Sequence, residues 1–377
     1  MKPLASADLP PSDATMLHAL DLVIRGSTPE ELDPALSVLV EFGLLDRFIL
    51  PDAFGGGFRY VAAWVDVLKL LSGLGGVDLS VARILEGHLN ALQLVATYGQ
   101  PDQQAMVLRH AGRGDLLGVW GADATEPVRM HADGPGSWRL TGAKRYATAV
   151  GTVQRAVVPV TDDNGQIQLL LLPVADDRRV DLASWNHRGM RRSASGTFRF
   201  DGMRIGPSAI LGALDDYRRE PLFVGGIWRC AAAQLGAIEA VVAGICRELS
   251  DTGRDAHPLQ MARIGSAILA ARTARLWVED AAARVEACSP DAPRAHIEHV
   301  VALAAYARLA TEKAAMEVID LAERGLGLAS FAAGHAVEAL TRDLAVYIRQ
   351  ANPDAVLLQH GRVLARRLSD GVTDDSV

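Results

Sequence analysis

Two residues that suit the binding of a flat aromatic ring stand two positions apart in this 377-residue chain. Tyr146 offers an aromatic face and Thr148 a short hydroxyl, both within the segment Leu140-Thr-Gly-Ala-Lys-Arg-Tyr-Ala-Thr148. Side chains two apart on a strand project to the same side of the sheet. The pair can therefore stack on a planar group and hydrogen-bond to its edge. A half-buried strand tyrosine without a ligand is the alternative that these residues leave open.

The histidines and cysteines give weaker signals. His88, in Glu86-Gly-His-Leu89, is either a hydrogen-bond donor in a site or a satisfied histidine on a helix flank. His296 and His299 are three residues apart and have no third ligand near them, so we expect a solvated helix face and no metal site. Three cysteines without CxxC spacing indicate neither a zinc site nor a disulfide framework, and they fit a cytoplasmic protein.

The elements that must position these residues follow from the hydrophobic periodicity. Helical spacing runs to about residue 113, with loops expected at 50–57 and 72–76, and a period of two begins at Leu116. We therefore expect a mainly α protein with a central β domain. Its parts are an N-terminal α-helical domain (1–115), a middle antiparallel β-barrel or sandwich (116–212) and a C-terminal four-helix bundle (213–377), with helices at about 220–250, 258–288, 293–324 and 333–349.

The middle domain carries further local signals. Asp162-Asp-Asn-Gly165 predicts the turn of a β-hairpin, and residues 197–205 alternate as one strand. A small sheet between helical domains can hold a flat ring at their junction, where interdomain pockets usually form. This order of domains therefore points to a flavin.

Composition excludes several classes of partner. The net charge of −7 argues against a nucleic-acid surface, because phosphate binding needs a concentrated basic field. Residues 231–246 are the most apolar helical stretch, and Gln234 and Glu239 interrupt them, so we expect no membrane segment. Mean hydropathy of +0.13 is slightly apolar for a monomer, which makes subunit interfaces plausible.

Five motifs in order resemble the acyl-CoA dehydrogenase superfamily over nearly the whole chain. They are Pro51-Asp-Ala-Phe-Gly-Gly56, Tyr98-Gly-Gln-Pro-Asp-Gln-Gln104, Thr125-Glu-Pro127, Leu140-Thr-Gly-Ala-Lys144 and Val337-Glu-Ala-Leu-Thr-Arg-Asp343. The resemblance implies FAD bound where the sheet meets the bundle, in a homotetramer or homodimer, with a neighbouring subunit reaching the adenine end. It also implies an acyl-CoA or other small-molecule substrate and an electron-transfer flavoprotein as the acceptor of electrons.

The resemblance assigns residues to the flavin. Tyr146 takes the place of the aromatic residue against the isoalloxazine, and Thr148 that of the hydroxyl near its reactive edge. Other expected contacts come from Trp120, Ala122 and Thr125 through the backbone. For the pyrophosphate the resemblance implies Gly325 and Gly327, facing the FAD of another subunit, and Arg254. The motif around Arg254 is shorter than the family's and lacks its Phe-Gly.

The family's catalytic glutamate is missing. Its usual position is Ala351 here, and the alternative position used by some relatives falls near Gly226. Glu220 and Asp354 are the nearest carboxylates in sequence, and both are typical of helix caps. The first expectation is therefore an FAD-dependent, acyl-CoA dehydrogenase-like oxidoreductase that transfers hydride to the flavin, with its catalytic base unassigned.

Other features resemble the flavin-dependent monooxygenases that share this fold. Arg192-Ser-Ala-Ser-Gly-Thr197 is similar to their motif, which makes Arg192, Ser193 and Ser195 expected substrate-binding residues. Such enzymes need no α-proton base, and His88 and Thr148 become the candidate hydrogen-bond donors. They use FMN or FAD reduced by a separate flavin reductase. The chain departs from their C-terminal histidine motif at 351–354. A third hypothesis is a degenerate, non-catalytic paralogue that assembles with an active homologue.

Overall fold

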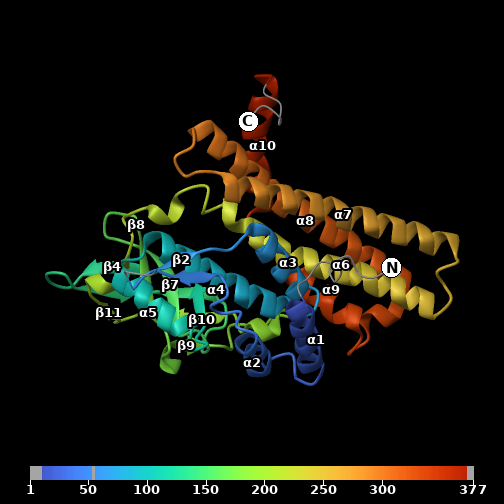
Figure 1. Cartoon of the computed structure of the whole chain (residues 1–377), viewed down its shortest axis with the longest axis horizontal. Coiled ribbons are helices and arrows are strands. Elements are labelled where there is room, and N and C mark those ends of the chain that lie inside the picture. Colours follow the sequence, from blue (N-terminus) through green and yellow to red (C-terminus); the bar gives the residue numbers. More distant parts are fainter. Residues whose placement is uncertain (1–10, 53–55, 372–377) are drawn as a thin grey trace.

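A computed structural model gives the structure of residues 11–52 and 56–371. A β region forms one side of the molecule and a long helical bundle forms the other (Figure 1). The N-terminal helices lie at the junction of the two, and the last helix projects away from the body. One contiguous hydrophobic core runs through all three parts.

The N-terminal part is helical, as predicted, with one small hairpin. Its elements are α1 (Pro11–Arg25), α2 (Asp33–Glu41), β1 (Ile49–Pro51), β2 (Phe58–Tyr60), α3 (Trp64–Gly75), α4 (Leu79–Tyr98) and α5 (Pro101–Ala111). The loop predicted at 50–57 is the connection of the β1–β2 hairpin, and residues 53–55 of it lie outside the described residues. Asp78 caps α4 by accepting a hydrogen bond from the Val81 amide at 2.9 Å.

The loop predicted at 72–76 is wrong, because α3 continues to Gly75. The glycines serve a helix crossing there. A Cβ atom on Gly75 would lie 2.0 Å from the Ala233 carbonyl oxygen of α6 (Trp228–Asp251), and one on Gly236 would lie 1.8 Å from the Ser72 carbonyl oxygen. The two backbones therefore approach more closely than any side chain would allow. This contact fixes the N-terminal part against the bundle.

We expect Gly236→Ala to destabilise the protein by about 1–3 kcal/mol, because the added methyl forces α3 and α6 apart. The measurement is the free energy of urea unfolding. Gly265→Ala on α7 (Pro258–Ala287) is the matched control, since a Cβ there meets no atom within 4 Å. The control should gain up to about 1 kcal/mol from helix propensity. Equal effects of the two substitutions would contradict the close crossing.

The strands of the middle part all fall between 117 and 211, inside the segment predicted as β. They are β3 (Leu117–Val119), β4 (Arg129–Ala132), β5 (Trp138–Thr141), β6 (Ala143–Ala147), β7 (Arg155–Thr161), β8 (Ile167–Pro173), β9 (Val180–Asp181), β10 (Gly196–Arg199), β11 (Arg204–Ile205) and β12 (Ile210–Leu211). Seven of them form one sheet in the order β11-β5-β4-β7-β8-β12, with β3 beside β7. A second sheet has the order β6-β10-β9.

Two details of the sheets differ from the prediction. The sheet is not purely antiparallel, because β3 and β4 both pair with β7 in parallel. The single strand predicted at 197–205 is two strands, since the chain turns at Gly202, with φ +73°, and passes from the small sheet to the large one. The predicted β7–β8 hairpin is confirmed, with Gly165 in the left-handed region of its turn.

The C-terminal part confirms the four predicted bundle helices and adds a fifth helix. The four are α6, α7, α8 (Arg294–Leu326) and α9 (Ala336–Tyr347), and the fifth is α10 (Pro353–Ser369). The prediction omitted α10, which leaves the body of the molecule (Figure 1). Only His360 of α10 is buried, while Leu357, Leu358 and Leu368 are exposed. It therefore lacks the buried apolar stripe that marks a core helix.

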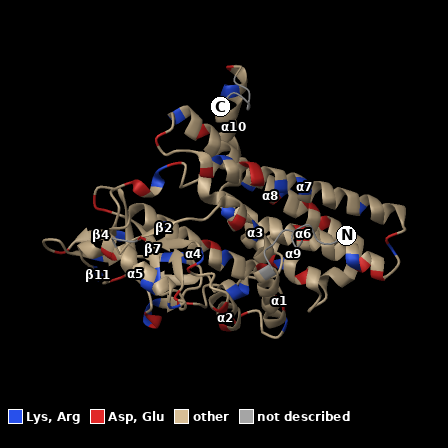
Figure 2. Ribbon diagram, in the orientation of Figure 1, with Lys and Arg blue, Asp and Glu red and all other residues tan. Residues whose placement is uncertain are grey.

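Among the described residues, one helical stretch, Gly225–Asp251, is long and apolar enough to cross a membrane by length and composition alone. Of its most apolar window, 72% is buried inside the protein. That burial is typical of a core helix in a bundle, because such a helix is apolar on most of its faces. Positive and negative residues are interspersed along the elements (Figure 2).

Candidate functional site

The backbone is strained at two neighbouring segments that both carry predicted site residues. Tyr146 and Ala149 have φ of +53° and +54°, and Met190 and Ala194 have φ of +59° and +42°. The left-handed region is unusual for residues other than glycine, and a bulky side chain there is an outlier. Such strain persists only where the surroundings impose it, and it concentrates at functional sites.

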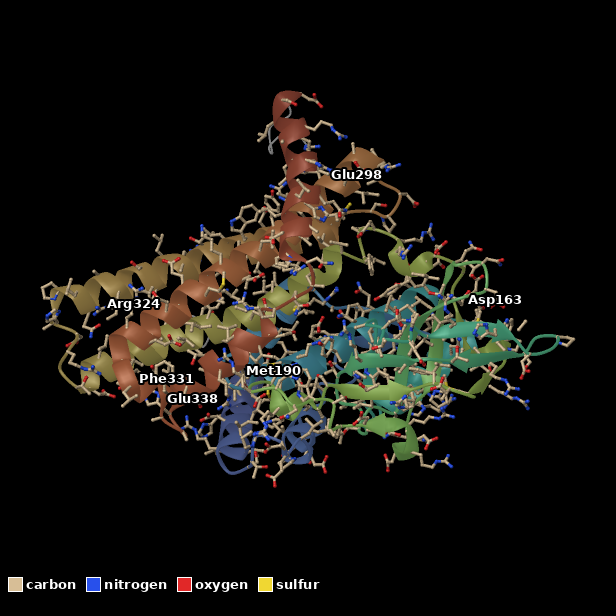
Figure 3. All side chains as sticks on the ribbon, turned by 180° about the vertical axis from the view of Figure 1, so that it is seen from behind. Asp163, Met190, Glu298, Arg324, Phe331 and Glu338 are labelled. Atoms are coloured by element: carbon tan, nitrogen blue, oxygen red, sulfur yellow. The ribbon has the colours of Figure 1, made fainter. Side chains whose placement is uncertain are left out.

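Hydrogen bonds hold the two strained segments together. The Ala149 amide donates to the Ser193 carbonyl oxygen at 2.8 Å, and the Val150 amide donates to the Ala194 carbonyl oxygen at 3.2 Å. Met190 lies where the β region meets the bundle (Figure 3). The strained segments therefore stand at the junction that the sequence predicted for a bound ring.

A chain of buried hydroxyls links the two segments. Ser193 Oγ donates to the Met190 carbonyl oxygen at 2.7 Å and lies 2.8 Å from Ser195 Oγ. Ser195 Oγ also lies 3.4 Å from Thr148 Oγ1. Each hydroxyl has one proton, and Ser193 gives its proton to Met190, so Ser195 donates to Ser193 and can accept from Thr148. The Thr148 hydroxyl thus ends the chain with one long contact, which a ligand can replace. The structure thus brings Thr148, predicted at the cofactor, together with Ser193 and Ser195, predicted at the substrate.

Tyr146 presents an aromatic surface that is 48% exposed. Its ring meets Trp185 edge-on at 6.1 Å between centroids and His187 at 6.2 Å, and these two rings stack on each other at 4.2 Å. The Arg145 guanidinium carbon lies 5.0 Å from the Tyr146 centroid. The three rings form an aromatic corner beside the hydroxyl chain, which suits a planar ligand.

The segment 120–126 runs beside β6 and is fixed to it. The Arg145 amide donates to the Ala122 carbonyl oxygen at 2.9 Å, and Lys144 Nζ donates to Asp123 Oδ1 at 2.7 Å. Burial lowers the pKa of Lys144, and its hydrogen bond to Asp123 opposes that shift. Ala122 and Thr125 are exposed next to the site. Trp120 is buried instead and donates its indole N–H to the Thr148 carbonyl oxygen at 3.1 Å.

His88 lies away from this site, and the backbone occupies both of its ring nitrogens. Its Nε2 is 2.8 Å from the Leu45 carbonyl oxygen, and its Nδ1 accepts from the Leu117 amide at 3.0 Å. This pattern fixes a neutral ring with the proton on Nε2. His88 is fully buried, and burial lowers its pKa to about 4. These are the contacts of a structural histidine that ties α4 to β3, and they leave no nitrogen for a ligand.

We expect this histidine to make the protein less stable in acid. Its pKa is about 4 when folded and about 6.5 when unfolded, so the unfolded chain binds the proton more tightly. Its stabilising contribution is therefore present above pH 6.5 and is lost as the pH falls toward 4. Between pH 7 and pH 5 the free energy of unfolding should fall by roughly 2 kcal/mol from this group.

Urea unfolding at several pH values measures that loss. The variant His88→Gln cannot take up the proton, so its stability should depend less on pH by the same amount. An identical pH dependence in the variant and the natural protein would contradict the assignment.

Arg192 has structural partners, although the sequence predicted it as substrate-binding. Its Nε donates to Asp78 Oδ2 at 3.0 Å, and its Nη1 donates to Ser27 Oγ at 3.2 Å and to the Glu31 carbonyl oxygen. The side chain is 4% exposed. It joins the strained segment to the N-terminal part and to the cap of α4.

The residues predicted for the pyrophosphate lie at the far end of the bundle. Arg254 follows α6, and Gly325 at the end of α8 accepts a hydrogen bond from Gln260 Nε2 at 3.0 Å. Gly327 has φ +66° and open space where a Cβ would be. Arg324 marks this end, and Met190 lies at the other end (Figure 3). One chain therefore does not bring Arg254, Gly325 and Gly327 to the aromatic corner.

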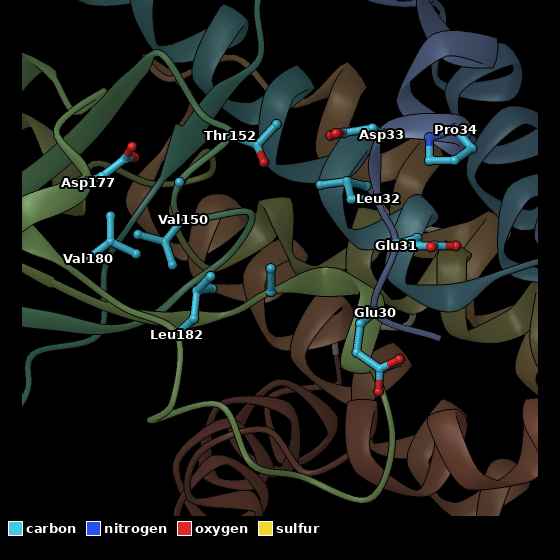
Figure 4. Close-up of a pocket in the computed structure, with 12 residues that line it drawn as sticks. Glu30, Glu31, Leu32, Asp33, Pro34, Val150, Thr152, Asp177, Val180 and Leu182 are labelled. Carbon is cyan, nitrogen blue, oxygen red and sulfur yellow. The ribbon is translucent and has the colours of Figure 1, made fainter. Parts of the chain in front are cut away.

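One cavity region adjoins the strained segments, and its charged lining residues are all acidic. It has a volume of about 780 Å³ and lies between the loop before α2 and the middle part (Figure 4). Its four charged lining residues are Glu30, Glu31, Asp33 and Asp177. A lining with carboxylates and no cation repels phosphate. We therefore do not place a flavin phosphate there.

A smaller cavity lies between α4, the start of α6 and the segment that precedes α6. It has a volume of about 160 Å³. Its lining comprises polar residues of α4 and Tyr98, Val119 of β3, and residues of the segment 217–229. Tyr217 Oη lies 2.9 Å from where a Cβ on Gly121 would be, so the cavity borders the segment 120–126. It is thus adjacent to the candidate ring site.

No family model matches the chain. The probable FMNH2-dependent monooxygenase SfnC of Pseudomonas putida is 27% identical over 194 residues, which make up 50% of this chain and 46% of SfnC. The match thus covers about half the length of that relative.

Two solved structures resemble nearly the whole chain. FMN-bound TdsC from Paenibacillus sp. A11-2, a dibenzothiophene monooxygenase, has a TM-score of 0.82 at 16% identity, covering 94% of this chain and 96% of TdsC. Butyryl-CoA dehydrogenase from Megasphaera elsdenii has a TM-score of 0.79 at 16% identity, covering 95% and 99%. The chain therefore has the acyl-CoA dehydrogenase-like fold. The fold predicted from the five sequence motifs is confirmed.

Within the acyl-CoA dehydrogenase-like fold, neither expected base position carries a carboxylate. Gly226 lines the 160 Å³ cavity, and the Ala351 carbonyl oxygen accepts from Arg308 Nη2 at 2.9 Å. Glu220 accepts from the Val224 amide at 3.0 Å, and Asp354 lies in the first turn of α10. Burial raises the pKa of Glu220, while its backbone hydrogen bonds oppose that. Asp354 thus occupies a helix start, as its sequence context predicted, whereas Glu220 accepts from backbone amides of the turn that precedes α6.

Sequence reasoning missed the polar wall of this cavity. Glu86, Asn90, Gln93 and Thr97 all line it from one face of α4. Their spacing of four, three and four residues is a polar stripe on an otherwise apolar helix, a signal that was available in the sequence. Arg229, at the start of α6, lines the cavity as well and is 3% exposed.

Proposed function

We propose that this protein is a flavin-dependent monooxygenase that uses reduced flavin and molecular oxygen. The observation that carries the proposal is the buried hydroxyl chain ending at Thr148, beside an aromatic corner on strained backbone, with no carboxylate at either base position. A monooxygenase needs hydrogen-bond donors near the flavin and no base for an α-proton. The names of SfnC and TdsC support this reading.

The residues present fit a flavin ring. Tyr146 and its neighbours provide a planar contact, and Thr148 provides a hydroxyl at the end of the buried chain that can donate to the ring. The flavin would supply the redox chemistry with oxygen, and the protein would supply the stacking surface, the hydrogen bond and the excluded water. FMN is favoured over FAD as the bound form, because the similar TdsC structure holds FMN and SfnC is named as FMNH2-dependent.

An acyl-CoA dehydrogenase-like reaction is the second candidate, and one observation favours it. Glu86 is 4% exposed and lines the same cavity as Gly226. A carboxylate on α4 could accept a substrate proton although the two family positions lack one. The reaction would transfer hydride to the flavin of the holoenzyme and pass electrons to an electron-transfer flavoprotein.

Anaerobic and aerobic mixing experiments separate the candidates. We expect a panel of acyl-CoA thioesters to leave the oxidised flavin unbleached without oxygen. Mixing the reduced, flavin-loaded protein with oxygen should give a transient absorbance that differs from oxidised flavin. Bleaching by a thioester would favour the dehydrogenase. A colourless preparation that takes up neither FMN nor FAD would leave only the non-catalytic paralogue.

Two kinds of partner follow from this proposal. A separate flavin reductase would supply the reduced cofactor, since no second nucleotide site is evident in the described residues. A homodimer or homotetramer would cover the outer face of α7, where Leu259, Met261, Leu269 and Leu276 are each 49–69% exposed. Exposed apolar patches of this kind mark association surfaces. Light scattering of the purified chain tests the oligomeric state.

A further inference from the structure

The 160 Å³ cavity has charged lining residues, and each of them is paired with an opposite charge. Its charged lining residues are Glu86, Arg219 and Arg229. Each has a counter-ion that does not itself line the cavity. Arg229 Nη2 contacts Glu286 Oε1 at 2.7 Å, Arg219 Nη1 contacts Asp216 Oδ1 at 3.3 Å, and Arg83 pairs with Glu86. An ionic ligand would therefore lose its hydration without gaining an unpaired partner, so the cavity favours a neutral ligand.

Opposite walls of the cavity differ in chemistry. The α4 wall is polar except for Leu94, whereas Val119, Leu222, Phe223 and Ile227 make the rest largely apolar. The Glu86 carboxylate accepts from Asn90 Nδ2 at 2.5 Å and pairs with Arg83, which leaves acceptor positions on both oxygens. A ligand that fills this cavity therefore needs an apolar body and one O–H or N–H donor.

The volume limits the size of that body. A dry cavity of roughly 150 Å³ in a protein core holds benzene. About 160 Å³ is thus sufficient for one six-membered ring with a small substituent. Tyr217 and Phe223 form an edge-on aromatic pair, 4.8 Å between centroids, that bounds the cavity on the side of the segment 217–229. A fused second ring would require this pair to move.

We propose that the cavity binds the substrate, and that the substrate is a compact, neutral, single-ring-sized molecule whose hydroxyl or amine donates a hydrogen bond to Glu86. The oxidation of this ligand rests on the proposed monooxygenase function. The binding preference of the cavity is independent of that function. Glu86 determines specificity through its charge balance with Arg83. Changing either partner should therefore change the charge of the ligand that is preferred.

The test compares four probes by calorimetry on the full chain. Phenol, benzoate and benzylammonium share one ring and differ in charge, and 2-naphthol keeps the hydroxyl on two rings. We expect phenol to bind at least tenfold more tightly than the other three. Equal or tighter binding of benzoate or benzylammonium would overturn the proposal. Tight binding of 2-naphthol would overturn the limit on size.

Two variants, each removing one charge of the Arg83–Glu86 pair, test whether this pair sets the preferred charge of the ligand. Glu86→Gln leaves Arg83 unpaired and should shift the preference toward benzoate by at least tenfold. Arg83→Met leaves Glu86 unpaired and should shift it toward benzylammonium by a similar factor. Circular dichroism checks the folding of each, and either variant alone is sufficient if the other does not fold. An unchanged order of probes in a folded variant would overturn the assignment.

A size variant and a turnover assay complete the test. Phe223→Ala should admit 2-naphthol, with affinity at least tenfold above that of the natural protein. Oxygenation of phenol by the protein with reduced FMN then tests the reaction separately. If the binding order holds and no probe is oxygenated, the cavity assignment stands and the proposed function fails.

Discussion

Thr148→Val is expected to speed the return of the oxidised-flavin spectrum by on the order of 100-fold. The interval is counted from the mixing of reduced, flavin-loaded protein with oxygen. The Thr148 hydroxyl ends the buried chain, and its only side-chain hydrogen-bonding contact among the described residues is the 3.4 Å contact with Ser195. Removing a preorganised donor from a water-excluded site costs far more than removing one in water. Hydrogen peroxide release should rise in step. Stopped-flow absorbance and a peroxide assay measure the two effects.

The matched variants separate the hydroxyl from the shape of the side chain. Thr148→Ser keeps the donor and should behave like the natural protein within about a factor of ten. Ser195→Ala removes only the hydroxyl in contact with Thr148 and should have an intermediate effect. If Thr148→Ser and Thr148→Val decay at the same rate, the hydroxyl has no role at the flavin.

The sequence was sufficient to place the main elements because their periodicity is strong. Four bundle helices and the β7–β8 hairpin appear where the pattern predicted them. The errors share one cause. Gly75 was interpreted as a loop signal although its missing Cβ serves the contact with α6, and the strand at 197–205 divides between two sheets. A local pattern does not show which distant backbone a residue meets.

In the candidate site, too, local motifs were informative and contacts with distant segments were not predictable. Tyr146, Thr148, Ser193 and Ser195 were predicted from short motifs, and the structure brings them together. The left-handed backbone at Tyr146 was not predictable, since no local signal marks a positive φ at a tyrosine. Arg192 was predicted to bind substrate, and His88 was left open between a site donor and a structural histidine, because the structural partners of both come from remote segments.

The positions of the partners explain both of those assignments. The Leu45 carbonyl oxygen is 43 residues from His88, and Ser27 is 165 residues from Arg192. A histidine or arginine looks free in a sequence whenever its acceptor lies in another element. Buried polar groups are nearly always hydrogen-bonded, so an interior position alone favours a structural role. Exposure therefore separates Tyr146, which is half exposed, from His88, which is fully buried.

Tyr146→Ala is expected to weaken flavin binding by about 1–3 kcal/mol, which corresponds to a loss of up to roughly 100-fold in affinity. The ring is 48% exposed at the corner with Trp185 and His187, so its loss removes stacking area without opening the core. Titration of FMN and FAD followed by flavin fluorescence measures the affinity. Tyr146→Phe keeps the ring and should retain most of it.

Tyr146→Gly distinguishes the ring from the backbone that carries it. Glycine accepts φ near +53° without strain, so this variant should be more stable than Tyr146→Ala by on the order of 1 kcal/mol. Both variants lack the ring and should bind flavin equally weakly. Strong binding by the glycine variant alone would mean that the strained backbone, and not the aromatic face, sets the affinity. Full retention of flavin by both variants would place the ring site away from β6.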